Sequence, residues 1–294
     1  MYALDHLAQD QLLLKSSSGE ICARIDLAKG ASIQDLTLEG VDLIREHPRF
    51  GYADSYASAI MSPFVNRLDA GTYTFAGQRY TLPLNNPKDG AAHHGLVYNQ
   101  TFRLLDQVLE ADHATLVFEH DYSGHLAGYP FPHRLLVDYQ FEARQFAVRL
   151  TIQNTGTSAM PYSLGWHPYF QVQDRNLTEV SFRSSGKVIT NERGVGSGMT
   201  SSQEEMTVAP KDGFFDTCWG LEGGEVFFDA PDYRFRMETP KESAFIHIYT
   251  PPGLPELIAI EPTTGVSNNF NHGVGLSTLE AGAEQSVKWI LSLL

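Results

Sequence analysis

A histidine enclosed by aromatic residues is the first side chain in this sequence that could carry chemistry. His167 lies between Trp166 and Pro168 within the aromatic stretch 162–170. A proline disfavours helix in the residue before it, so the sequence predicts that His167 lies at the end of a strand. Aromatic rings beside a titratable imidazole suit a site that holds a small polar molecule by its apolar face. A histidine satisfied within an aromatic core would show the same pattern.

A second candidate is Glu261, which follows the apolar run 257–260 and precedes Pro262. The sequence predicts a strand that ends at this carboxylate. Apolar neighbours fix the position of a carboxylate and strengthen it as a base, so Glu261 could serve as a general base. The alternative is a strand-terminal glutamate that turns into solvent.

Two histidines close a polar loop at residues 85–95, where His93 and His94 precede Gly95. Successive side chains of an extended chain point to opposite faces, so we expect only one of the two to enter a given site. The glycine would allow a ligand or the backbone to approach closely.

Two further polar residues could bind a ligand. Arg67 follows Asn66 directly, and its planar guanidinium could hold sugar hydroxyls or pair with a carboxylate. Asp216 lies within the aromatic stretch 214–219. This composition is expected where a carbohydrate stacks on rings while a carboxylate accepts its hydroxyl protons.

Several common classes of site lack their motifs in this sequence. It contains no H-E-x-x-H, and the spacing of its 11 histidines and its glutamates does not fit a metal-binding barrel, so we expect no metal. There is no G-x-S-x-G, no phosphate-binding loop and no G-x-G-x-x-G. Their absence weighs against a serine hydrolase, an NTP-binding protein and a dinucleotide-binding protein.

The chain of 294 residues carries a net charge of −14, from 21 basic and 35 acidic residues. This charge disfavours nucleic acids, anionic membranes and strongly anionic substrates, so we expect neither a nucleic acid nor a membrane as partner. Cys22 and Cys218 lie far apart in the sequence and are expected to be free thiols, with a disulfide between them as the alternative. No secretion signal is visible, nor an apolar run near the roughly 18 residues of a membrane span, and we expect a cytoplasmic protein.

Alternation of apolar and polar residues is the main structural signal. It is clear in 146–152 and again in 137–141, with a hairpin turn expected at 142–145. Similar short runs lie at 20–27, 72–84, 114–119, 225–228, 244–249, 257–260 and 286–293. Because no long amphipathic helix separates them, the sequence predicts an all-β fold, a large antiparallel β-sandwich with few short helices, in a single domain over 1–294. The stretch 194–202, rich in glycine and serine, is predicted to be a mobile loop.

Taken in order, these motifs resemble those of the aldose 1-epimerase (galactose mutarotase) family. The residues that carry the resemblance are Asn66-Arg67, Leu84-Asn85-Asn86, His94-Gly95, Gly128-Tyr129-Pro130, His167-Pro168-Tyr169-Phe170, Asp216 and Glu261-Pro262. The family implies a galactose mutarotase-like supersandwich with an open sugar cleft, no cofactor and a small-molecule sugar as substrate. By the same resemblance, Glu261 would be the catalytic base, His167 the acid and His94 a second histidine near the reacting oxygens. Arg67 and Asp216 would bind the sugar.

Anomer exchange is chemistry that such residues can perform. A proton leaves the C1 hydroxyl and another reaches the ring oxygen, the ring opens, the C1–C2 bond rotates, and the ring closes on the other face. Each positioned acid or base contributes about 10²–10⁴-fold. We expect the charge of Glu261 to keep His167 protonated near neutral pH, and the two groups to meet across one sugar ring.

The sequence leaves the substrate and the assembly open. Where the family often has Leu-His-Gly-Gly, this chain has His93-His94-Gly95-Leu96, a change in the predicted lining of the cleft. One alternative is a mutarotase for a modified hexose, such as a 6-phosphate or a sulfonated sugar. The other is a non-catalytic carbohydrate-binding protein. The chain could be a monomer or a homodimer.

Overall fold

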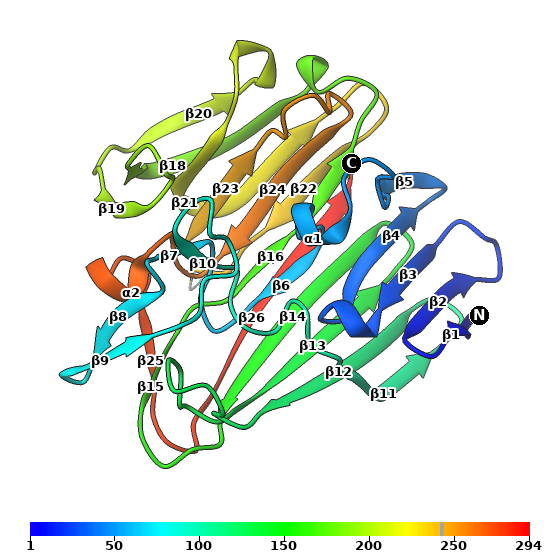
Figure 1. Ribbon diagram of the computed structural model, residues 1–294. Helices are drawn as coiled ribbons and strands as arrows, with labels where there is room; N and C mark the ends of the chain where they lie inside the picture. The colour runs from blue at the N-terminus through cyan, green and yellow to red at the C-terminus, as the bar shows by residue number, and fades with distance from the viewer. Residues whose placement is uncertain (242–243) are drawn as a thin grey trace.

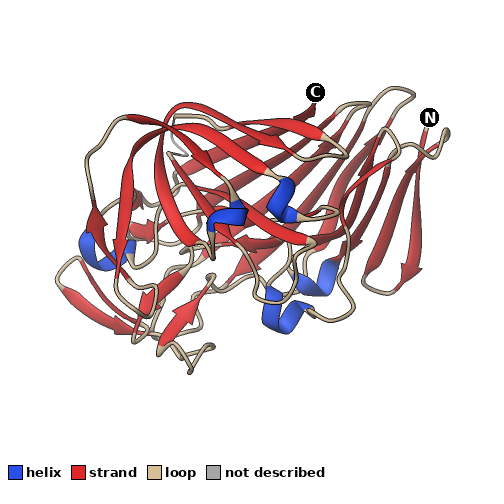
Figure 2. Cartoon of the chain, turned by 90° about the horizontal axis from the view of Figure 1, so that it is seen from above, coloured by secondary structure: helices blue, strands red, loops and turns tan. Residues whose placement is uncertain are grey.

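The computed structural model describes residues 1–241 and 244–294, and most of them form β-strands (Figures 1 and 2). In that part of the chain the α-helices are two single turns, α1 (Tyr52–Ser55) and α2 (Asn269–His272). The prediction of an all-β fold with few short helices is therefore confirmed. No helix in the described ranges is long and apolar enough to cross a membrane.

The strands follow one another with short connections. In chain order they are β1 (Tyr2–Ala8), β2 (Gln11–Ser16), β3 (Cys22–Asp26), β4 (Ser32–Leu38), β5 (Val41–Ile44), β6 (Ala59–Met61), β7 (Arg67–Asp69), β8 (Thr72–Phe75), β9 (Gln78–Thr81), β10 (Ala91–His93), β11 (Arg103–Leu109), β12 (Ala114–Tyr122), β13 (His133–Phe141), β14 (Gln145–Asn154), β15 (Met160–Tyr162), β16 (Gly165–His167), β17 (Tyr169–Gln171), β18 (Glu179–Thr190), β19 (Gly196–Met199), β20 (Glu204–Val208), β21 (Asp216–Asp229), β22 (Arg234–Glu238), β23 (Phe245–Tyr249), β24 (Leu257–Thr263), β25 (Ser277–Leu279) and β26 (Glu284–Leu293). Three 3₁₀ turns, Leu27–Lys29, Arg175–Leu177 and Pro210–Asp212, complete the regular structure of the residues described.

One large antiparallel sheet runs through the molecule in the order β11-β12-β13-β14-β26-β22-β21-β23-β24-β16-β6 (Figure 1). A second sheet of five antiparallel strands, β1 to β5 in sequence order, packs against it. The hydroxyl of Tyr139 on β13 donates a hydrogen bond to the carbonyl of Ala31 just before β4, at 2.8 Å, and so joins the two layers. The architecture is the predicted β-sandwich.

The core follows the predicted alternation. Along β13, Leu135, Val137, Tyr139 and Phe141 are fully buried, while the residues between them are partly exposed. Burying one such side chain is worth about 1.5–3 kcal/mol, so a strand of this pattern is held firmly to one register. The predicted turn at 142–145 is also present, closed by hydrogen bonds between the backbones of Glu142 and Gln145.

Three predicted segments differ from the structure. The run 72–84 is a hairpin of β8 and β9, because Ala76 and Gly77 both take the positive φ of a tight hairpin turn. The stretch 194–202 is not a free loop, since β19 within it pairs with β18. Strand β24 does not end at Glu261 but continues through Pro262 to Thr263, in register with β23.

Candidate active site

A cavity of about 350 Å³ lies over the large sheet. It is lined by Phe50, Asp54, Ser55, Tyr56, Asn66, Arg67, Asn86, Asp89, His93, His94, His167, Tyr169, Phe214, Asp216, His247, Tyr249 and Glu261. All five residues predicted for a sugar site are among them, although they come from widely separated segments of the sequence. The fold thus brings the candidate base, acid and ligand-binding residues to one place.

The floor of the cavity is one cross-strand row of the sheet. On β23, His247 lies opposite Glu261 of β24 on one side and opposite Cys218 of β21 on the other. Directly opposed residues of antiparallel strands point to the same face. The three side chains therefore share the face of the sheet on which the cavity lies.

His167 extends the same row. The pairs Gly165–Thr263 and Tyr169–Ala259 lie two residues to either side of it, which sets His167 level with Glu261. Its strand β16 ends at His167, as predicted from the following proline. The alternation of the strand turns the ring towards the cavity and turns Trp166 into the core, where it is 1% exposed. The tryptophan is therefore a core residue and does not line the cavity.

Glu261 and His167 are in direct contact. His167 Nε2 lies 3.4 Å from Glu261 Oε1, and both side chains are almost fully buried. Within the described residues, the other polar atom of each group, His167 Nδ1 and Glu261 Oε2, has no hydrogen-bond partner. From the sequence we expected the two groups to face each other across the width of a sugar ring. In the structure they stand side by side.

His94 packs edge to face against His167. The two rings are 5.0 Å apart at 82°, and Tyr56 covers His94 at 4.7 Å. His94 Nδ1 lies 3.0 Å from the sulfur of Met61. The ring of His94 is thus held on several sides, next to the contact between Glu261 and His167.

Both histidines of the 85–95 loop line the cavity, contrary to the expectation that only one could. Strand β10 ends at His93, and His94 takes a positive φ of 55°. The rule of alternating faces applies to extended chain and not to this turn, so the two rings lie 5.0 Å apart on the same side. Gly95 follows with φ 80°, and a Cβ there would lie 2.1 Å from the carbonyl oxygen of Ser62, so the turn requires glycine.

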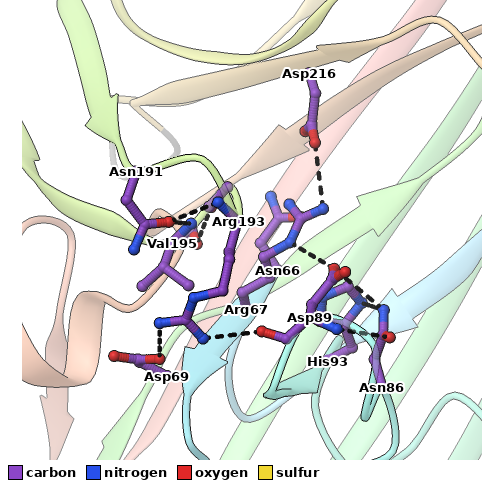
Figure 3. A network of polar contacts seen from close by, with 12 residues as sticks. Asn66, Arg67, Asp69, Asn86, Asp89, His93, Asn191, Arg193, Val195 and Asp216 are labelled. Atoms are coloured by element: carbon purple, nitrogen blue, oxygen red, sulfur yellow. Dashed lines mark hydrogen bonds and ion pairs between the residues drawn. The ribbon is translucent and has the colours of Figure 1, made fainter.

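Arg67 is the centre of a polar network (Figure 3). Its guanidinium donates from Nε to Asp89 at 3.1 Å and from Nη2 to Asp216 at 3.2 Å. The hairpin between β18 and β19 covers it from outside, since a Cβ on Gly194 would lie 2.7 Å from Nη1. Arg193 in the same hairpin is tied to Asp69 and to the backbone carbonyl of Asp89. The guanidinium of Arg67 is therefore fixed in one orientation.

His247 is a functional candidate that our reading of the sequence missed. Its Nε2 donates to Asp216 Oδ1 at 2.8 Å, and its Nδ1 lies 3.3 Å from the side-chain amide nitrogen of Asn66. A signal was present: between Ile246 and Ile248, which face the core, the alternation places His247 on the opposite face of a buried strand. A buried polar residue on that face needs a partner, which points to a site.

The two histidines beside Glu261 differ in their electrostatics. Burial lowers the pKa of His167 below its ordinary value, and the opposing charge of Glu261 does not fully offset this. For His247, burial also acts to lower the pKa, but the charge of Glu261 and the hydrogen bond to Asp216 raise it well above the ordinary value. The expectation from the sequence that Glu261 keeps His167 protonated is therefore wrong, and of the two histidines it is His247 whose surroundings favour the charged form.

Burial and neighbouring charges also set the pKa values of the other ionisable groups in the cavity. Burial acts to raise the pKa of Asp216, but the hydrogen bond to His247 and the charge of Arg67 hold it below its usual range. Burial lowers the pKa of His93 to about 4 and that of His94 well below its ordinary value. The cavity therefore holds ionised Asp216 and neutral His93 and His94 near neutral pH.

Aromatic side chains form one wall of the cavity. Phe214 packs edge-on against Tyr249 at 5.8 Å, Tyr249 against Tyr169 at 6.4 Å, and Tyr169 against Phe50 at 5.7 Å. Such rings can offer apolar faces to a small ligand, while the polar row of the floor can pair with its polar groups.

Both cysteines are free thiols, and Cys218 is buried in the floor row. In the described ranges, no group of three or more His, Cys, Asp or Glu side chains is arranged to hold a metal ion.

Comparison with known proteins agrees with this description. The aldose 1-epimerase family model matches residues 23–292, and the chain therefore belongs to the aldose 1-epimerase family. The chain is 26% identical over 266 residues to the uncharacterized protein YihR of Escherichia coli K12, a match that covers 86% of this chain and 84% of YihR.

Solved structures show the same fold at low identity. A galactose mutarotase-like protein from Clostridium acetobutylicum superposes with a TM-score of 0.86 at 18% identity, covering 100% of this chain and 98% of that one. Galactose 1-epimerase from Lactobacillus acidophilus NCFM superposes with a TM-score of 0.78 at 13% identity, with coverage of 100% and 98%. The galactose mutarotase-like fold expected from the resemblance is confirmed.

Proposed function

We propose that this protein is an aldose 1-epimerase that interconverts the α and β anomers of an aldohexose by general acid–base catalysis. One observation carries the proposal. The carboxylate of Glu261 and the imidazole of His167 stand 3.4 Å apart at the floor of the cavity, each with one buried polar atom that has no partner within the described chain. Buried polar atoms are usually satisfied, so two unpaired ones side by side suggest that a ligand completes them.

The spacing suits the chemistry of the anomeric carbon. The hydroxyl oxygen that loses a proton and the ring oxygen that gains one are both bonded to C1. A base and an acid that act on these two oxygens must therefore lie close together. In this proposal the active form has Glu261 ionised and His167 protonated, a state that the lowered pKa of His167 favours on the acidic side of neutral pH. Glu261 accepts the proton of the C1 hydroxyl while His167 donates one to the ring oxygen. The C1–O5 bond breaks and an aldehyde forms.

Reclosure returns both protons. After rotation about C1–C2, the C5 hydroxyl attacks the other face of the aldehyde and gives its proton back to His167. The new alkoxide at C1 takes a proton from Glu261. The number of protons on the pair is then the same as at the start. Two positioned groups of this kind give about 10²–10⁴-fold each, which suffices for a reaction that also proceeds in water.

The other predicted residues would hold the sugar. Arg67 and Asp216, locked together at 3.2 Å, present N–H donors and carboxylate oxygens to hydroxyls. His94 is neutral, because burial keeps its pKa well below the ordinary value, and it packs against the ring of His167. It can therefore accept or donate a hydrogen bond near the reacting oxygens without adding charge.

A modified hexose with a phosphate or sulfonate group is the less favoured substrate. Among the described residues that line the cavity, Arg67 is the only arginine or lysine, and both Asp89 and Asp216 already pair with it. An anionic group would need a cation that is free to bind it. Polarimetry or exchange NMR of glucose, galactose and their 6-phosphates separates the two cases, and we expect turnover of the neutral sugars.

The decisive test of the function is Glu261→Gln. We expect mutarotation to fall by at least about 10²-fold while sugar binding, measured by calorimetry, persists, because the amide keeps the shape but cannot accept the proton. Near wild-type turnover in this variant would remove Glu261 from the role of base.

A matched control is Glu256→Gln. Glu256 lies just before β24 and pairs with His47 and Arg49, and it is not among the described residues that line the cavity. The same change of a carboxylate to an amide should therefore leave turnover at the wild-type level. An equal loss in both variants would point to a general disturbance of β24 instead of a lost base.

A further inference from the structure

The row that carries the reacting pair contains a second imidazole. His247 lies directly opposite Glu261 across β23 and β24, on the side of the carboxylate away from His167. It is 5% exposed and lines the cavity. One buried carboxylate is thus flanked by two histidines on neighbouring strands.

The two histidines have different hydrogen-bond partners. His247 Nε2 donates to Asp216 at 2.8 Å, and Nδ1 faces the side-chain amide of Asn66 at 3.3 Å. A side-chain amide can present either its oxygen or its nitrogen, so Asn66 can accept from a protonated Nδ1. His167 Nδ1, in contrast, has no hydrogen-bond partner in the described chain. Of these two, His167 is free to exchange a proton with a ligand, whereas His247 is held at both nitrogens.

The charges around His247 call for a cation. Asp216 on β21 and Glu261 on β24 face it from the two neighbouring strands, and Arg67 stands beyond Asp216. Cys218 is its uncharged neighbour in the row. Buried carboxylates are retained when they are paired, and Arg67 is already shared between Asp216 and Asp89. An imidazolium at His247 places a positive charge beside Glu261 and gives Asp216 a second cationic partner besides Arg67.

We infer that His247 is a positioning residue whose fixed positive charge stands between Glu261 and Asp216 and sets the pH range in which the Glu261–His167 pair works. The inference rests on the function proposed above. A neighbouring positive charge opposes protonation of His167, and it is one of the influences that lower the pKa of that residue. Neutral His94 and His93, which also lie near His167, add no such charge near neutral pH.

The test is the pH dependence of mutarotation in His247→Gln. Glutamine can keep a hydrogen bond to Asp216 but carries no charge. We expect activity to fall with rising pH as His167 loses its proton, and this fall to move to higher pH by about one unit in the variant. Cys218→Ala is the matched control, because it removes an uncharged neighbour of His247 and leaves both carboxylates that favour its charge, so its profile should move much less.

A second measurement does not depend on the variant. In protein labelled with ¹⁵N-histidine, we expect one imidazolium signal to persist above pH 8, where an ordinary histidine with a pKa near 6.5 is neutral. Absence of such a signal, or an unshifted profile in folded His247→Gln, overturns the inference. If Glu261→Gln is inactive in the same assays, the proposed function survives that result. If Glu261→Gln is fully active, the proposed function fails first.

Discussion

In both halves of the large sheet, successive side chains alternate between the two faces, but the side chains on these faces serve different purposes in the two halves. In the half formed by β11–β14 and β26, one face is apolar and packs against β1–β5, as the fully buried Phe118 and Tyr139 show. In the half formed by β21, β23, β24 and β16, the alternation presents a row of titratable groups to a cavity. The first half thus buries a mainly apolar face, whereas the second gathers unsatisfied polar atoms, His167 Nδ1 and Glu261 Oε2, around one cavity at some cost in stability.

The largest effect should come from a core substitution in the first half. Phe118 is fully buried and packs against Tyr139 at 5.7 Å, so Phe118→Ala should lower the free energy of unfolding by about 3–5 kcal/mol. Turnover per folded molecule should stay near wild type. Phe227→Ala, which removes a 37% exposed ring, is the control and should cost far less in urea unfolding. Loss of turnover in folded Phe118→Ala would contradict the division between the halves.

A smaller effect is expected on the pH dependence of stability, from a buried histidine that has a structural role only. His133 begins β13, and burial lowers its pKa to about 4. The unfolded chain, with a histidine pKa near 6.5, binds a proton first as the pH falls, so this contribution to stability is lost between about pH 6.5 and pH 4. His133→Phe should reduce the loss of stability between pH 7 and pH 5 by about 2 kcal/mol.

The control for this titration is His113→Phe, which replaces a half-exposed histidine. Urea unfolding at the two pH values should show an unchanged difference for that variant. If His133→Phe behaved in the same way, the acid sensitivity of the fold would have to come from the cavity half, where His93 is also buried with a pKa of about 4.

The smallest effect tests how the cavity half is held in shape. A Cβ on Gly194 would lie 2.7 Å from the guanidinium of Arg67, so Gly194→Ala should displace that group and raise KM about three- to tenfold. Gly282→Ala is the matched control, because Gly282 has a similar positive φ but no atom within 4 Å of the new Cβ. Equal KM values in the two variants would show that Arg67 does not depend on the hairpin.

The structure of the half formed by β11–β14 and β26 could be predicted well from the sequence. That of the half that carries the cavity could be predicted in part. Along β13 the core and surface positions alternate, so the period of the pattern determines which residues are buried. Along β14 the pattern holds less well, because Ala147 and Thr151 are buried as well. Motif order identified Glu261, His167, His94, Arg67 and Asp216, all of which line one cavity. The roles of these residues, the single-domain organisation and the cytoplasmic location remain predictions.

What could not be predicted from the sequence depends on register and on local backbone conformation. That His247 faces Glu261 is a property of strand pairing between β23 and β24, which no local pattern encodes. That His93 and His94 share one side follows from the positive φ of His94. The charge state of His167 depends on burial, which only the assembled sheet determines.

The cross-strand row has a consequence for how this fold can vary. Because side chains alternate with a period of two, sliding β24 by a single residue would send the carboxylate of Glu261 into the apolar interior and bring a neighbour such as Ile260 to the cavity. Insertions or deletions inside the strands of this row, β21, β23, β24 and β16, should therefore abolish turnover outright. The loops between these strands can lengthen at small cost. Measured turnover therefore reports whether the strands that carry this row are paired in the correct register.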